Sequence, residues 1–365
     1  MARYLCLHSN CMIVGGISRS TICDIQRNEY HLVPNSLAGM FAESRFVDTG
    51  KIKKSLDAHS GAILDEYENF LIRNELAFYA GSLKECSHFP PVSTEWDFPA
   101  HISNMIIDVS DAYELDLASV LASLKNLNCR YIQFRFYEKV RMPQLKKMVG
   151  LVNNSHVISI DILAPSEGLE VSELISLVEN NRKINHFILH NYAYDGVLYD
   201  EGGFGVGKIL TVSERLESEM HCGIIHPNYF SVNIETYTEA QHFNTCLNRK
   251  ISIDRNGFIK NCPSMKQHFG HLSDTKLEDV AGNEAFRQYW HIRKDEIRKC
   301  RDCEFRYICT DCRAYTEYPG DLHAAPLKCG YDPYSCEWEE WSSNPLKKKA
   351  METYSASPTL QYSEA

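Results

Sequence analysis

Eight of the fourteen cysteines in this 365-residue chain fall within its last third, and this clustering limits what the region can fold into. Thiols two to five residues apart converge on one point only where turns bring them together, and a metal centre is the usual reason for such turns. The sequence therefore predicts metal ligands among these eight residues, which are Cys246, Cys262, Cys300, Cys303, Cys309, Cys312, Cys329 and Cys336.

The spacing of these cysteines predicts how the ligands are grouped. Cys246 and Cys262 flank the segment ISIDRNGFIK, whose Asn-Gly pair at 256–257 is typical of a tight hairpin turn, so both thiols can face one metal. Two further pairs, 300/303 and 309/312, have the two-residue spacing of metal-binding knuckles. Eight thiols are enough for two four-ligand sites.

Composition excludes several other classes of protein. The chain is 44% hydrophobic and 24% charged, which is typical of a globular protein. Its formal net charge of -10 argues against a broad nucleic-acid-binding surface, and no apolar run is long enough to span a bilayer. The first residues, MARYLCLHSNCMIVGG, lack the layout of a signal peptide, so we expect a cytoplasmic protein with reduced thiols.

The hydrophobic pattern predicts an α/β protein with several domains. Residues 1–82 show short strand patterns followed by helical spacing, the order of a winged-helix-like α+β domain. Residues 83–95 indicate a linker, and 96–240 alternate strands with helices, which predicts parallel strands in a partial (β/α) barrel or open sheet. Residues 241–341 form the cysteine-rich domain and 342–365 a flexible tail.

In more detail, 96–240 is expected to hold strands at 105–109, 131–136, 157–163, 186–189, 222–226 and 231–234, with helices at 115–127, 145–152 and 171–178. The cysteine-rich part is expected to contain one clear helix, at 286–297.

The cysteine spacing resembles the SPASM domain that follows the catalytic barrel in many radical-SAM enzymes acting on peptides. That pattern is a cysteine, nine to fifteen residues, a glycine, four residues and a cysteine, then Cys-x2-Cys-x5-Cys-x3-Cys and a last cysteine. The matching positions are Cys246, Gly257, Cys262, Cys300, Cys303 and Cys309. The chain departs from the pattern at Cys312, which two residues instead of three precede.

The resemblance implies two auxiliary 4Fe–4S clusters. Cys300, Cys303 and Cys309 with Cys329 or Cys336 would bind one, and Cys246, Cys262 and Cys312 the other. The family's further ligand lies a few residues before the first cysteine, where this chain has Ala240. His242, Cys222 or the remaining late cysteine could replace it, or one iron stays open. From the knuckle spacing alone, 300–312 also fits tetrahedral zinc.

The catalytic motif of radical-SAM enzymes is absent. Their Cys-x3-Cys-x2-Cys follows the first barrel strand, whereas here 105–109 is followed by Ser-Asp-Ala-Tyr at 110–113, and no such triplet occurs anywhere. This combination resembles the SPASM-domain maturases of grasp-with-SPASM systems. The resemblance implies a short precursor peptide, an ATP-grasp ligase that forms a graspetide, and no reductive cleavage of S-adenosylmethionine.

The N-terminal region resembles the PqqD-like RiPP recognition element, which binds a leader peptide as an added strand beside a helix. The resemblance implies a peptide site at Tyr30, His31, Leu32, Val33, Phe70 and Arg73. A winged helix that reads DNA is the alternative, but no predicted helix carries a dense basic face.

Three hypotheses follow. The first is a peptide maturase partner without catalysis of its own, which captures the precursor and presents it to the ligase. The second is a SPASM-containing peptide-modifying redox enzyme, and the third a zinc-stabilised winged-helix DNA-binding regulator. The sequence leaves homodimer formation open.

Overall fold

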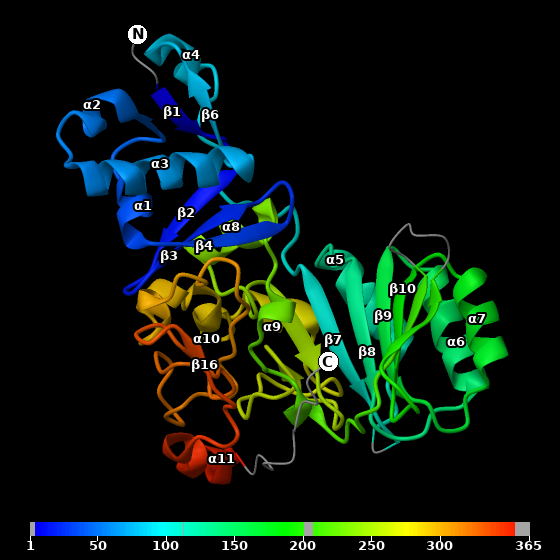
Figure 1. Ribbon diagram of the computed structural model, residues 1–365. Helices are drawn as coiled ribbons and strands as arrows, with labels where there is room; N and C mark the ends of the chain where they lie inside the picture. Colours follow the sequence, from blue (N-terminus) through cyan, green and yellow to red (C-terminus); the bar gives the residue numbers. More distant parts are fainter. Residues whose placement is uncertain (1–3, 112, 201–206, 355–365) are drawn as a thin grey trace.

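The computed structural model describes residues 4–111, 113–200 and 207–354, and these form a mixed α/β protein (Figure 1). Its largest feature is a mostly parallel sheet of eight strands. Smaller antiparallel sheets make up the N-terminal unit, and eleven α-helices occur in the described part of the chain. The α/β class expected from the sequence is confirmed.

The N-terminal unit contains two three-stranded antiparallel sheets. The first has the order β5-β1-β6 and the second β2-β3-β4, so β4 lies at a sheet edge. The bounds are β1 Tyr4–Leu7, β2 Cys11–Gly15, β3 Ser20–Asp24, β4 Glu29–Val33, β5 Phe46–Asp48 and β6 Ala77–Ala80.

Four helices accompany these sheets, and the longest is α3 (Ala58–Arg73). It begins at Asp57, whose side chain accepts a hydrogen bond from the Ser60 amide at 2.7 Å, a typical N-cap. Leu64 and Leu71 are buried on its inner face. The others are α1 Asn35–Gly39, α2 Thr49–Lys53 and α4 Leu83–Ser87, the last within the segment interpreted as a linker.

The large sheet has the strand order β11-β12-β10-β9-β8-β7-β13-β14. Four strands of its middle, β7 to β10, are joined by helices α5, α6 and α7, whose apolar sides form one core with the sheet (Figure 1). The order begins at β11 and ends at β14, and these two strands do not pair with each other, so the sheet is open. The bounds are β7 Asn104–Val109, α5 Leu117–Asn126, β8 Tyr131–Phe136, α6 Met142–Asn153, β9 Ser159–Pro165, α7 Val171–Glu179 and β10 Ile184–His190.

The prediction of strands at 222–226 and 231–234 is wrong. Gly223 has a φ of +87° and Pro227 follows shortly, so this part of the chain forms 3₁₀ turns and one isolated bridge. Residue 234 instead begins helix α8 (Ile234–His242). The sheet is completed by β11 (Gly196–Asp200) and β12 (Lys208–Thr211).

The cysteine-rich region begins with the expected hairpin. Strands β13 (Lys250–Ile253) and β14 (Ile259–Lys260) pair antiparallel across a turn at Gly257 (φ +85°). β13 also pairs in parallel with β7, so this hairpin belongs to the large sheet. After it come short elements, namely α9 Leu277–Gly282, α10 Glu284–Arg287, β15 Tyr331–Asp332, β16 Glu337–Trp338 and α11 Lys348–Tyr354.

Two further expectations for this region are corrected. The helix expected at 286–297 breaks into α10 and two 3₁₀ turns, because its apolar side chains enter two different cores: Phe286 packs with the sheet and Ile297 with Cys262. The expected tail at 342–365 is folded in its first part, where Met351 is buried beside Trp341. Residues 355–365 lie outside the described part.

No helix in the described chain combines the length and the apolar character needed to cross a bilayer.

Candidate functional site

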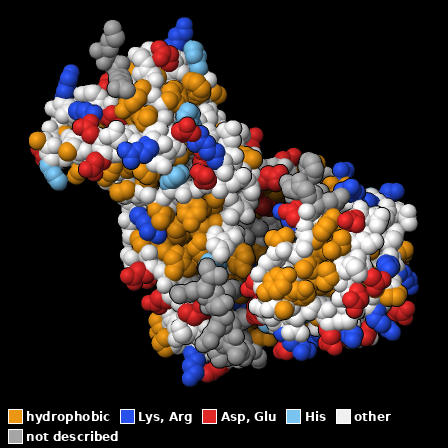
Figure 2. Space-filling view, turned by 45° about the vertical axis from the view of Figure 1, so that its right-hand side comes forward, with side chains coloured by type: hydrophobic (Ala, Val, Ile, Leu, Met, Phe, Trp, Pro, Cys, Tyr) orange, Lys and Arg blue, Asp and Glu red, His pale blue; other side chains and the backbone are white. Residues whose placement is uncertain are grey.

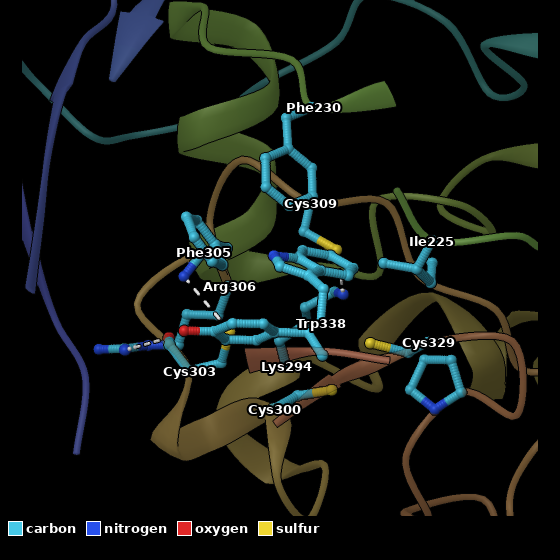
Figure 3. Close-up of a pocket in the computed structure, with 12 residues that line it drawn as sticks. Ile225, Phe230, Lys294, Cys300, Cys303, Phe305, Arg306, Cys309, Cys329 and Trp338 are labelled. Carbon is cyan, nitrogen blue, oxygen red and sulfur yellow. Dashed lines mark hydrogen bonds between the residues drawn. The ribbon is translucent and has the colours of Figure 1, made fainter. Parts of the chain in front are cut away.

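Four of the predicted ligands line one pocket. Cys300, Cys303, Cys309 and Cys329 contribute to its wall, and Figure 3 shows the sulfur atoms of Cys300, Cys309 and Cys329 turned toward the space between them. The pocket as a whole, with its opening to solvent included, encloses about 330 Å³. We call this set the first thiol group.

Local turns bring these four thiols together. Lys299 has a φ of +69° and reverses the chain, and the Cys303 amide then donates to the carbonyl of Cys300 at 3.0 Å. A second turn closes where the Cys309 amide donates to the Phe305 carbonyl at 3.0 Å. Cys329 comes from far along the chain and is held by a bridge to Ile225.

The rest of the pocket wall is mainly apolar and aromatic. Phe230, Phe305, Tyr331 and Trp338 line it, and Phe305 and Tyr331 stand edge to face with ring centroids 5.1 Å apart. The indole of Trp338 lies 4.9 Å from the Tyr331 ring. A wall of this kind keeps water from the sulfur atoms and lowers the local dielectric.

Two donors point at the sulfurs. The Lys294 ammonium donates to Cys309 Sγ at 3.1 Å and to the carbonyl of Thr310 at 2.8 Å, and the Phe305 amide donates to Cys303 Sγ at 3.4 Å. Burial alone would lower the pKa of Lys294, but the sulfurs of Cys309 and Cys300 outweigh it and raise that pKa. A buried cation beside thiols stabilises negative charge on sulfur.

Burial raises the pKa of the thiols themselves. It brings the pKa of Cys300 to about 12 and also raises the pKa of Cys303 and Cys309. Without a bound metal these groups therefore hold their protons at neutral pH. A metal that binds here must displace the protons, so its affinity increases with pH.

Cys336 is not part of the pocket wall. It has a φ of +62° and its thiol points toward the carbonyl of Pro333, at 3.9 Å. Between the two late cysteines that the sequence left open, the structure thus places Cys329, and not Cys336, with Cys300, Cys303 and Cys309.

The other predicted ligands lie together at the hairpin. Cys246 precedes β13 and Cys262 follows β14, and both pack into one apolar cluster. Burial raises the pKa of Cys312, and the nearby sulfurs of Cys246, Cys222 and Cys262 raise it further. We call Cys246, Cys262 and Cys312 the second thiol group. Its neighbour Cys222 was one of several candidates for the missing ligand.

The hairpin is rigid for reasons that the sequence carries. The carboxylate of Asp254 accepts hydrogen bonds from the amides of Asn256 and Phe258 at 2.9 and 3.0 Å, which fixes the turn. The same side chain pairs with Lys260 at 2.7 Å. The Lys250 ammonium donates to Cys246 Sγ at 3.5 Å, as Lys294 does in the first group.

Within residues 4–111, 113–200 and 207–354, no group of three or more His, Cys, Asp or Glu side chains is placed to hold a metal ion. A single zinc ion needs thiols about 3.8 Å apart, because Zn–S bonds of about 2.3 Å are arranged tetrahedrally. The thiols of the described residues do not form such a tetrahedral set.

The residues expected to bind a peptide are divided between two faces of the β2-β3-β4 sheet. His31 faces α3, with its ring 6.0 Å from that of Phe70, and Val33 is buried in the core on the same side. Tyr30 lies on the opposite face, against Phe230 and Phe305 of the pocket wall. Leu32 is 42% exposed, and Arg73 is exposed at the end of α3.

The edge of β4 has backbone groups that face outward. The Gly16 amide donates to the Arg19 carbonyl, and the Ile25 amide donates to the Asn10 carbonyl, so the odd-numbered residues of β3 form hydrogen bonds with β2. In an antiparallel sheet, the residues between them then form hydrogen bonds with β4. By the β3–β4 register, Tyr30 and Leu32 therefore direct their N–H and C=O groups away from the sheet. Such an edge can pair with another extended chain.

No family model matches this chain, and no curated protein is significantly similar to it.

Proposed function

We propose that this protein captures a ribosomal precursor peptide and presents it to a partner enzyme, an ATP-grasp ligase, in the biosynthesis of a graspetide. The observation that carries the proposal is the position of the β4 edge. That edge lies beside α3, and the same strand packs through Tyr30 onto the wall of the first thiol group.

The edge supplies affinity without requiring a particular sequence. An extended leader would pair with the outward backbone groups of Tyr30 and Leu32, and its side chains would alternate between the two sides of the new strand. On one side lie α3, Phe70 and Arg73, which form an apolar wall with a cation at its end. This wall favours a leader that combines apolar and acidic side chains.

Contacts between the N-terminal unit and the cysteine-rich region determine where a peptide bound at β4 would continue. Arg19 pairs with the buried carboxylate of Glu304 at 2.6 Å, and the Ile17 amide donates to the carbonyl of Asp302 at 2.8 Å. These bonds hold the β2-β3 hairpin on the cysteine-rich region. Figure 2 shows apolar side chains gathered on the surface directly below the N-terminal unit. A peptide bound at β4 would continue over this surface.

The thiol groups would hold one or two 4Fe–4S clusters, with zinc as the alternative metal. Iron–sulfur ligation by four thiolates is the chemistry that such a set offers. Because no Cys-x3-Cys-x2-Cys motif is present, we assign the clusters a structural role: their binding free energy becomes folding free energy for a region of short elements.

A DNA-binding role is disfavoured by the charge on α3. Its exposed side chains include Asp65 and Glu66, and Arg73 at its end is its only Lys or Arg. Phosphate contacts require a denser basic face. The opposite face of the adjacent sheet is covered by the cysteine-rich region.

The test uses the full chain purified without oxygen and a synthetic, fluorescein-labelled leader of a short precursor peptide encoded beside the gene, which the proposal requires to exist. We expect saturable binding by anisotropy. Leu32→Pro removes an outward N–H without removing a bond to β3, and should weaken binding at least ~10-fold, about the free energy of one hydrogen bond. Leu32→Ala keeps the N–H and is the matched control.

Equal weakening by both variants would show that the side chain, and not the strand edge, binds the leader. Absence of binding by the wild-type protein would contradict capture altogether. Release of 5'-deoxyadenosine from S-adenosylmethionine would instead favour a redox enzyme.

A further inference from the structure

The loop that carries Cys222 is shaped to lie against the second thiol group. Gly223 has a φ of +87°, and a Cβ placed on it would stand 2.7 Å from Cys312 Sγ. Glycine thus allows the backbone next to Cys222 to touch a sulfur of that group. The Ser264 hydroxyl, two residues after Cys262, also donates to the carbonyl of Glu219 at 3.1 Å.

Buried polar contacts hold this loop in place. The Lys328 ammonium, on a side chain that is almost entirely buried, donates to the carbonyls of Met220 and Cys222, the latter at 3.0 Å. The Ile225 amide donates to the Lys328 carbonyl at 3.0 Å, next to the bridge between Ile225 and Cys329. One segment therefore connects the loop of Cys222 with the first thiol group.

The electrostatic surroundings of the thiols agree with this position. The Lys250 ammonium donates to Cys246 Sγ at 3.5 Å and also lies near the sulfurs of Cys262 and Cys222. Four sulfur atoms and one cation thus share a small region near Arg135 of β8.

We propose that Cys222 is the fourth ligand of the second site, with Cys246, Cys262 and Cys312, and that this site binds a 4Fe–4S cluster. The inference rests on the proposed function. It replaces the ligand expected near Ala240 with one from the loop between the large sheet and α8. Each thiol would release its proton as its sulfur binds iron. The cluster would thereby join this loop, the β13–β14 hairpin and the knuckle of Cys312.

The experiment measures iron and acid-labile sulfide per chain after anaerobic reconstitution with ferrous iron and sulfide, together with the electron paramagnetic resonance spectrum of the reduced protein. The wild-type chain should hold about eight irons, or two clusters. The Cys222→Ser variant should hold about four irons per chain and lose one of the two electron paramagnetic resonance signals. Cys329→Ser should lose the other signal, and Cys336→Ser, outside both groups, should keep both.

Alkylation provides a second measurement that needs no variant. Cys222 is exposed, so iodoacetamide should modify it in the metal-free chain and not in the reconstituted chain, as read by mass spectrometry. The inference would be overturned if the Cys222→Ser variant held as much iron as the wild-type chain and kept both signals. It would also be overturned if Cys222 were alkylated equally in the metal-free and the reconstituted chain. A wild-type chain without iron would overturn the proposed clusters themselves.

Discussion

Arg313 and Asp311 form a fully buried ion pair inside the knuckle that carries Cys309 and Cys312. Arg313 Nη2 donates to Asp311 Oδ1 at 2.8 Å, and Nε lies 2.6 Å from Oδ2. Arg313 Nη1 donates to the carbonyls of Leu322 and Ala324. Although burial opposes the charge, Arg313 and Lys294 hold the pKa of Asp311 below its usual range. The pair thus fixes the loop between the two thiol groups.

Asp311→Ala should therefore destabilise the protein strongly. It leaves the Arg313 guanidinium buried without a counter-charge, which typically costs about 3–5 kcal/mol. Urea unfolding followed by circular dichroism measures the loss. Asp321→Ala is the matched control, since its pair with Arg298 is largely exposed and should contribute little to stability. Equal losses in both variants would contradict the role of the buried pair.

Gly257→Ala should open the β13–β14 turn. The positive φ of Gly257 disfavours a side chain, and a Cβ there would lie 2.6 Å from His271 Nε2 and 3.0 Å from the Tyr113 ring. We expect a loss of about 1–3 kcal/mol. Gly150→Ala, in α6 with open space around it, should instead stabilise by about 0.5–1 kcal/mol. Thermal unfolding compares the two, and a neutral Gly257→Ala would refute the strain.

Glu239 on α8 makes stability depend on pH. Burial raises its pKa from 4.5 to about 7, although Asn248 donates to its carboxylate at 2.8 Å. Because the pKa of Glu239 is higher in the folded than in the unfolded state, the free energy of unfolding is highest below pH 4.5 and falls as the pH rises through 7. In Glu239→Gln this fall in the free energy of unfolding, on the order of 2 kcal/mol, should be absent.

The measurement is urea unfolding at pH 4.5, 6 and 8. Glu235→Gln, on an exposed position of the same helix, should keep most of the wild-type decline, because burial and not the charge of Glu235 is the main cause of the raised pKa of Glu239. If Glu239→Gln also keeps the decline, another group causes it.

Lys294→Met should lower the reduction potential of an iron–sulfur cluster held by the first thiol group. The ammonium bonds to Cys309 Sγ and favours the added electron, and methionine has similar bulk without charge. A redox titration followed by electron paramagnetic resonance measures the change. Lys299→Met, whose ammonium pairs with Glu317 at 3.7 Å, is the control and should leave the potential unchanged. An unchanged potential in Lys294→Met would refute the effect of the buried cation.

Periodicity and spacing predicted the local elements well. The strand at 131–136 and the hairpin turn at Gly257 are where the sequence placed them, because alternation and an Asn-Gly pair are local signals. The knuckle spacing likewise predicted that Cys300, Cys303 and Cys309 lie together.

Long-range relations could not be read in this way. Nothing in the spacing distinguishes Cys329 from Cys336, because the choice depends on a bridge to Ile225. Cys222 lies outside the cysteine-rich region and approaches it only through the loop that Lys328 holds. The helix expected at 286–297 fails for a similar reason, since its apolar side chains serve two cores that the sequence does not separate.

The pairing of β13 with β7 has a consequence for synthesis on the ribosome. Lys250 aligns with Asn104, so the strand that covers this side of β7 is made long after β7 itself. Until then β7 is an unprotected parallel edge, and pairings between residues so distant in sequence form slowly. A chain truncated before the β13–β14 hairpin would expose the unpaired edge of β7 and aggregate through it. The cysteine-rich region therefore also covers the unpaired edge of β7 once it has been synthesised.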